Sequence, residues 1–146
     1  MTAFAVALVV AGGLAGSVQA ALLGRFGDRI GSLEAFAFAT LVTAVIALVV
    51  LAIGRGSLHG YVAAARAPAW LWTAGAMGAL IVLGITYAAP RIGTTATIGI
   101  LVAGNLAMAA IIDRFGLFGL DKIPFHWPRI LGVILLAAGA ALSLKK

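Results

Sequence analysis

Five long apolar stretches, separated by short segments that hold almost all of the charges, constrain this chain more than any other feature. Each approaches or exceeds the ~20 residues that an apolar α-helix needs to cross the ~30 Å hydrocarbon core of a bilayer. They are Ala3–Gly24, Ile30–Gly54, Ala67–Ala89, Thr94–Ile112 and Pro128–Leu144. The sequence therefore predicts an all-α integral membrane protein, a bundle of five transmembrane helices in a single membrane domain over residues 1–146.

Composition excludes several other classes of protein. Of the 146 residues, 64% are hydrophobic and 10% are charged, whereas soluble domains have about 45–50% and about 25%. The chain has no cysteine, which removes disulfides, thiolate metal sites and cysteine nucleophiles. It also lacks a phosphate-binding glycine loop and a metalloprotease motif, and His59 and His126 lack metal-ligand spacing. We predict no enzymatic activity, no cofactor and no metal.

The net charge of +6 would suggest a nucleic-acid partner if the positions of the charges were ignored. The ten basic residues instead lie singly or in pairs between the apolar stretches, which is typical of loops that flank membrane helices. They are Arg25, Arg29, Arg55, Arg66, Arg91, Arg114, Lys122, Arg129, Lys145 and Lys146. We therefore expect membrane lipid, and not nucleic acid, as the surroundings of this chain.

The basic residues give the chain no preferred orientation in the membrane. If the chain crosses the membrane five times, five of the ten basic residues lie on each side. The rule that Lys and Arg collect on the cytoplasmic side therefore does not choose between the two orientations. Either other features set the orientation, or the chain inserts both ways. Dual insertion would let two copies pair about a two-fold axis in the membrane plane, the symmetry of transporters with inverted repeats. We predict such an antiparallel homodimer.

Small residues recur at four-residue spacing, which favours close packing of membrane helices. They are Gly12, Gly16, Ala20 and Gly24, then Gly75 with Ala79, and Gly99 with Ala103. The segment Pro90–Gly93 predicts a tight turn. Gly116 predicts the end of the fourth helix, within a structural turn at Asp113–Gly119.

Several segments resemble the YdcZ-like family, the half-size, five-helix members of the drug/metabolite transporter superfamily. The resemblance covers essentially the whole chain and is carried by Gly16–Ala21, Trp70–Gly78, Pro90–Gly93, Asp113–Gly119 and Arg129–Gly132. The run Asp-Arg-Phe-Gly-Leu-Phe-Gly at Asp113–Gly119 is the most specific of these. The resemblance implies a multi-pass protein of the bacterial inner membrane, working as a homodimer or as a pair of related halves, and acting as an exporter.

Polar side chains at membrane depth are the candidates for a substrate pathway, because each needs a polar partner or a wet cavity. Asn105 and Thr43 lie near the middle of their predicted helices, and Gln19 lies about 8 Å from the midplane at 1.5 Å per residue. We assign the pathway to Gln19, Thr43, Tyr87 and Asn105. The alternative is that the amides tie helices together and the threonines bond to their own helix.

Glu34 is the only carboxylate inside a predicted helix, so it is the one candidate for proton coupling. It lies within the first turns, where a solvated acid complements the helix dipole. We favour the solvated acid over a role in proton coupling. As a whole, the sequence predicts a secondary transporter that exports a small, partly apolar or cationic metabolite or drug by alternating access. The alternative is a non-transporting membrane subunit or scaffold that stabilises a partner complex.

Overall fold

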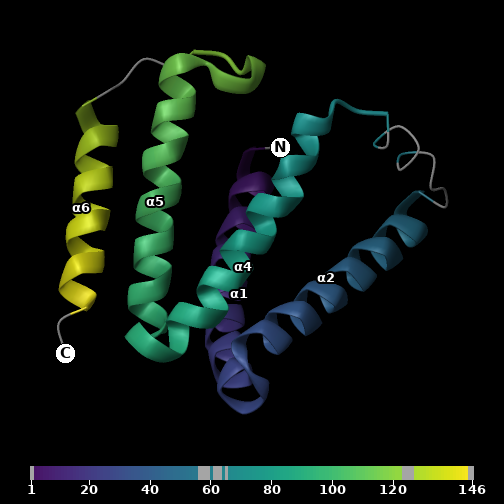
Figure 1. Cartoon of the computed structure of the whole chain (residues 1–146). Helices are drawn as coiled ribbons and strands as arrows, with labels where there is room; N and C mark the ends of the chain where they lie inside the picture. The colour runs from purple at the N-terminus through teal and green to yellow at the C-terminus, as the bar shows by residue number, and fades with distance from the viewer. Residues whose placement is uncertain (1, 56–59, 61–63, 65, 123–126, 145–146) are drawn as a thin grey trace. The chain divides into compact units, whose positions relative to one another are not determined.

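The computed structural model describes residues 2–55, 60, 64, 66–122 and 127–144, and every regular element among them is helical. In chain order the elements are α1 (Thr2–Ile30), α2 (Ser32–Arg55), the 3₁₀ helix η1 (Ala69–Trp72), α4 (Thr73–Ile92), α5 (Thr94–Phe115), the 3₁₀ helix η2 (Leu117–Gly119) and α6 (Trp127–Ser143) (Figure 1). This is the all-α architecture that the apolar stretches predict.

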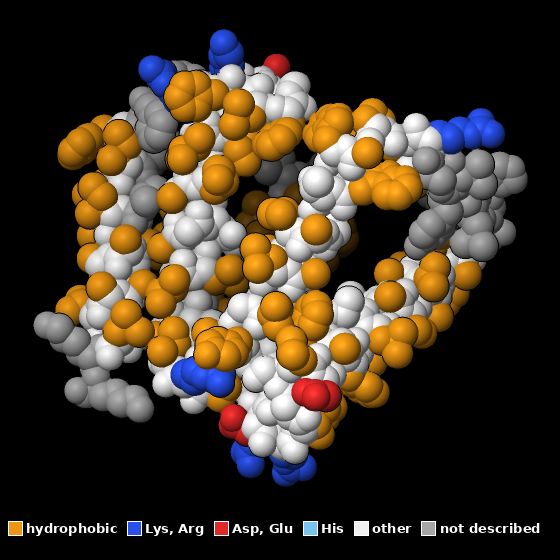
Figure 2. Space-filling view, viewed as in Figure 1, with side chains coloured by type: hydrophobic (Ala, Val, Ile, Leu, Met, Phe, Trp, Pro, Cys, Tyr) orange, Lys and Arg blue, Asp and Glu red, His pale blue; other side chains and the backbone are white. Residues whose placement is uncertain are grey.

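Four of these segments are long and apolar enough to cross a membrane, namely Thr2–Ile30, Ser32–Gly54, Ala69–Ile92 and Thr94–Phe115. The fifth, α6, has 17 residues, slightly fewer than the ~20 that span the hydrocarbon core. Hydrophobic side chains cover the visible lengths of the helices, and the charged side chains lie near helix ends (Figure 2). This pattern matches a membrane helical bundle of four to five apolar helices.

The chain divides into two compact units, and each is described by itself. Unit 1 comprises Met1–Ala21 with Arg91–Lys146, and unit 2 comprises Leu22–Pro90. The single membrane domain over residues 1–146 stays a prediction.

In unit 2 the end of α1 lies against α4 with almost no space between the two backbones. A Cβ added at Gly24 would lie 3.3 Å from the Cβ of Ala89, and one added at Gly27 would lie 3.4 Å from the Cγ2 of Thr86. Thr86 is fully buried and donates its hydroxyl to the carbonyl of Val82 at 2.8 Å. Gly24 therefore allows the close approach that its spacing predicts.

The connection between α1 and α2 is a single residue. Gly31 has φ of +101° and accepts the amide of Ala35 at 3.0 Å, which begins α2. A left-handed φ is costly for any residue with a Cβ. The rings of Phe26 and Phe38 meet edge to face, with centroids 5.5 Å apart, and hold the two helices together beyond the turn.

The tight turn predicted at Pro90–Gly93 is wrong, because α4 continues through Pro90 to Ile92. Proline removes one backbone hydrogen bond from a helix interior but does not always end the helix. The change of direction is confined to Gly93, whose φ is +85°. α1 also extends beyond its predicted end, through Arg25, Asp28 and Arg29.

In unit 1, α5 and α6 pack side by side (Figure 1). A Cβ at Gly99 would lie 3.2 Å from the Cβ of Ala140, whose side chain is buried. The helix α5 continues beyond its predicted last residue, Ile112, through Phe115, so the first residues of the predicted turn are helical. Gly116 ends the helix as predicted, because it takes the left-handed conformation and donates its amide to the carbonyl of Ile112. Not every predicted small residue marks a contact, since Cβ atoms at Gly12 and Gly16 would meet nothing within 4 Å in the described part of the chain.

Candidate functional site

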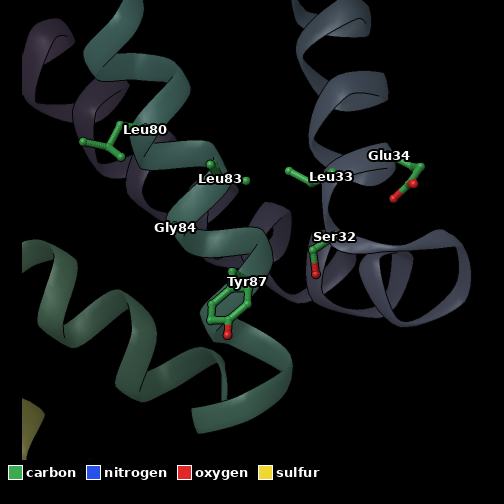
Figure 3. A pocket seen from close by; sticks show the side chains of 7 residues that line it. All are labelled: Ser32, Leu33, Glu34, Leu80, Leu83, Gly84 and Tyr87. Atoms are coloured by element: carbon green, nitrogen blue, oxygen red, sulfur yellow. The ribbon is translucent and has the colours of Figure 1, made fainter.

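An apolar cavity in unit 2 is the most developed candidate site among the described residues. It is open on one side and has a volume of about 610 Å³, a size typical of pockets that hold drug-sized molecules. Its lining residues come from the first turn of α2 and from one face of α4, and they are Ser32, Leu33, Glu34, Leu80, Leu83, Gly84 and Tyr87 (Figure 3). The cavity thus lies between two helices that the sequence predicts as separate membrane spans.

Helical spacing explains which residues of α4 line the cavity. Leu80, Gly84 and Tyr87 recur at intervals of four and three residues, so they share one face of the helix. The opposite face of α4 carries the buried residues Ile85 and Ala89. The buried residues of α4 and the residues that line the cavity therefore lie on different faces of the helix.

Gly84 gives the cavity part of its width. A Cβ added there would meet nothing within 4 Å in the described part of the chain, so no close helix contact requires a glycine at this position. Leu83 extends from α4 toward α2, and Leu33 extends from α2 toward α4 (Figure 3). These two side chains narrow the space beside Gly84.

Tyr87 and Ser32 supply hydroxyl groups to an otherwise largely apolar lining. The phenol of Tyr87 and the hydroxyl of Ser32 lie at the same end of the cavity in Figure 3, beyond the leucines. Tyr87 is 56% exposed, so one side of the cavity wall is open in a single copy of the chain. A molecule with an apolar body and one hydrogen-bonding end matches this arrangement.

The carboxylate of Glu34 is bent back toward the start of α2. A Cβ at Gly31 would collide with it, and Figure 3 shows the carboxylate on the side of α2 away from Leu83. Glu34 lies in the first helical turn and is exposed. This position suits an acid that complements the helix dipole, while the proton-coupling role of Glu34 stays a prediction.

The predicted pathway residues fall into different parts of the chain. Tyr87 and Glu34 line the unit 2 cavity, whereas Gln19 on α1 and Asn105 on α5 belong to unit 1, and both amides are exposed. Thr43 is exposed and donates its hydroxyl to the carbonyl of Ala39 at 2.9 Å. That bond satisfies the hydroxyl within its own helix. The pathway role of Gln19, Thr43 and Asn105 stays a prediction.

Unit 1 contains a smaller cavity, of about 370 Å³. It is lined by Ser17, Thr94, Thr95, Ile98, Gly99, Val102 and Leu136. The hydroxyl of Ser17 bonds the carbonyl of Gly13 at 3.3 Å. Thr97, in the same turn of α5, is instead buried and bonds the carbonyl of Gly93 at 2.8 Å. The threonines at the start of α5 therefore divide into cavity-lining and self-bonded residues.

Sequence reasoning did not identify most residues of the unit 2 cavity. The apolar residues Leu33, Leu80 and Leu83 are indistinguishable in sequence from leucines that face lipid. Gly84 carries the one usable signal. It lies between Leu80 and Tyr87 on the same helical face, and no close helix contact requires a glycine at this position. Among the residues described, no group of three metal-ligating side chains gathers anywhere.

A family comparison agrees with this architecture. Residues 4–142 match the family model described as putative inner membrane exporter, YdcZ. No curated protein and no solved structure matches the chain. Because the family model covers nearly the whole sequence, the resemblance carried by the motifs is confirmed, as is a multi-pass location in the inner membrane. The chain belongs to the YdcZ family, which is described as putative inner membrane exporters.

Proposed function

We propose that this chain is a secondary exporter of small, partly apolar molecules, and that the α2–α4 cavity of unit 2 binds the substrate. The observation that carries the proposal is a drug-sized, largely apolar cavity with hydroxyl groups from Tyr87 and Ser32. A few polar groups in an otherwise apolar cavity fix the orientation of a ligand. Membership of an exporter family supports transport as the activity.

Two copies of the chain, inserted in opposite orientations, form the complete transporter. Equal numbers of basic residues on the two predicted sides support dual insertion. The open wall of the cavity, where Leu80 is 63% and Tyr87 is 56% exposed, leaves room for a second copy to complete it. The two copies then alternate in opening the site to either side of the membrane, as transporters with inverted repeats do.

The function is tested by solute counterflow in proteoliposomes. The purified chain is reconstituted and loaded with a panel of unlabelled organic amines, amino acids, sugars and tetraphenylphosphonium, and uptake of each labelled solute is followed. We expect saturable uptake of at least one partly apolar solute above that of empty liposomes. A failure of the whole panel, together with co-purification of a stable partner protein, would support the scaffold alternative.

The cavity is tested by filling it. Gly84→Trp places an indole where a Cβ meets no neighbour, so we expect the protein to fold and counterflow to fall at least about tenfold, equivalent to about 1.4 kcal/mol. The matched control is Gly78→Trp on the same helix, which is equally unobstructed but does not line the cavity. Equal counterflow by the two variants would remove this cavity from the transport pathway.

A further inference from the structure

Asn105 places a polar side chain at the centre of the apolar helix α5. α5 runs over 22 residues from Thr94 to Phe115, which places Asn105 within about 1 Å of the helix midpoint at 1.5 Å per residue. The amide is exposed, and it makes no hydrogen bond within the described part of the chain. The only other polar side chains before the last turn of α5 are Thr94, Thr95 and Thr97, at its start.

Lipid cannot satisfy this amide. The hydrocarbon core offers no hydrogen-bond donors or acceptors, so an exposed primary amide at this depth has a strong tendency to acquire a protein partner. A second asparagine is a complementary partner, because each amide carries both an NH₂ donor and a carbonyl acceptor. Two facing asparagines can therefore satisfy each other.

The position of Asn105 selects the symmetry of such a pair. A two-fold axis in the membrane plane carries a residue above the midplane to an equal depth below it. Only a residue at the midplane then meets its own copy. Thr94 would face the opposite end of the partner helix, whereas Asn105 would face Asn105. Equal numbers of basic residues on the two predicted sides of the membrane favour the same axis.

The face of α5 around Asn105 has residues placed symmetrically about it. Ile98 and Ile112 lie two turns away in opposite directions, seven residues on either side of Asn105. Seven residues return to nearly the same face of a helix. Both isoleucines are half-buried within one copy, and Ile98 also lines the open unit 1 cavity. In an antiparallel pair centred on Asn105, Ile98 of one copy faces Ile112 of the other across that opening.

We propose that α5 packs against α5 of a second, inverted copy, and that the two Asn105 amides hydrogen-bond to each other on the two-fold axis. This inference rests on the antiparallel pairing in the proposed function, and it adds the helix and the residue through which the copies meet.

Single-cysteine cross-linking tests the pairing directly, because the natural chain has no cysteine. Native membranes that contain Asn105→Cys are oxidised with copper phenanthroline, and disulfide-linked dimer is measured on non-reducing gels. A disulfide requires Cβ atoms about 3.5–4.5 Å apart, so we expect a linked dimer. Ile100→Cys is the control, because Ile100 is 45% exposed but lies on a different face of α5, and it should stay monomeric.

A second pair of variants distinguishes antiparallel from parallel packing. Ile98→Cys and Ile112→Cys should each remain monomeric when expressed alone and should form a linked dimer when expressed together. Linked dimer from either variant alone would indicate parallel helices and overturn the proposal. So would a monomeric Asn105→Cys.

A measurement without cysteine covers the case in which the new thiols disturb packing. Donor- and acceptor-labelled chains are diluted with lipid in liposomes, and the dimer dissociation constant is read from energy transfer. We expect Asn105→Leu to raise this constant at least about tenfold and Asn105→Gln to retain dimerisation. An unchanged constant for Asn105→Leu would overturn the inference. Counterflow by that same variant would leave the proposed transport function intact.

Discussion

Glu34 and Tyr87 line the same cavity, but their side chains are placed for different purposes. The phenol of Tyr87 lies at the end of the cavity next to Ser32, while the carboxylate of Glu34 bends back over Gly31 (Figure 3). Depth along the helix was enough to predict that Glu34 lies in the first turn of α2, where an acid interacts favourably with the helix dipole. The bend of its carboxylate over Gly31 was not predicted. The cavity itself was not predictable, since it depends on how α2 and α4 are placed within unit 2.

Glu34→Gln separates a structural from a coupling role. The substitution keeps the shape of the side chain and removes its charge, so we expect a loss of about 0.3–1 kcal/mol of stability, the usual size of a helix-dipole interaction. Counterflow and proton-driven uptake should both continue. Thermal unfolding followed by size-exclusion chromatography and a pH-gradient uptake assay measure the two effects. Loss of proton-driven uptake with counterflow retained would instead identify Glu34 as the coupling residue.

At the scale of elements, hydrophobic length predicted the long helices, and their ends depended on local backbone chemistry. The left-handed Gly116 ends α5 where the sequence predicts it. The prediction of a turn at Pro90 was wrong. A proline usually indicates a turn in sequence, but Pro90 lies inside α4, and the break between α4 and α5 is at Gly93. Small-residue spacing identified positions capable of close packing. It did not distinguish Gly99, which contacts α6, from Gly12, which meets no neighbour in the described residues.

The contact between α5 and α6 is tested by enlarging Gly99. A Cβ there already lies 3.2 Å from the Cβ of Ala140, so Gly99→Leu must separate the helices. We expect a loss of about 1–3 kcal/mol, the usual cost of overpacking, measured as a lower midpoint of thermal unfolding. Gly104→Leu is the matched control, because a Cβ at Gly104 meets nothing within 4 Å. Equal midpoints for the two variants would argue against this packing.

At the scale of the whole molecule, composition placed the chain in the membrane and its motifs placed it in the exporter family. Neither identifies the partner of a half-size transporter, because pairing depends on surfaces that a single copy leaves uncovered. The proposed antiparallel homodimer rests on an even distribution of basic residues between the two predicted sides and on the amide of Asn105 at the midpoint of α5.

The charge balance itself can be shifted to test dual insertion. Arg25→Ala with Arg29→Ala leaves fewer basic residues on one predicted side, and Arg66→Ala with Arg114→Ala leaves fewer on the other; all four side chains are exposed. Each double variant should adopt one orientation. Cross-linking through Asn105→Cys should then fail for either variant alone and return when both are expressed together. Cross-linking of a singly oriented variant would contradict antiparallel pairing.

The orientation of the chain in native membranes tests antiparallel pairing most directly. A single cysteine appended after Lys146 is labelled with a membrane-impermeant maleimide in right-side-out and in inside-out vesicles. The antiparallel transporter predicts that about half of the C-termini are labelled in each preparation, because a homodimer with its two-fold axis in the membrane plane places one C-terminus on each face. Labelling of all C-termini from a single face would contradict it.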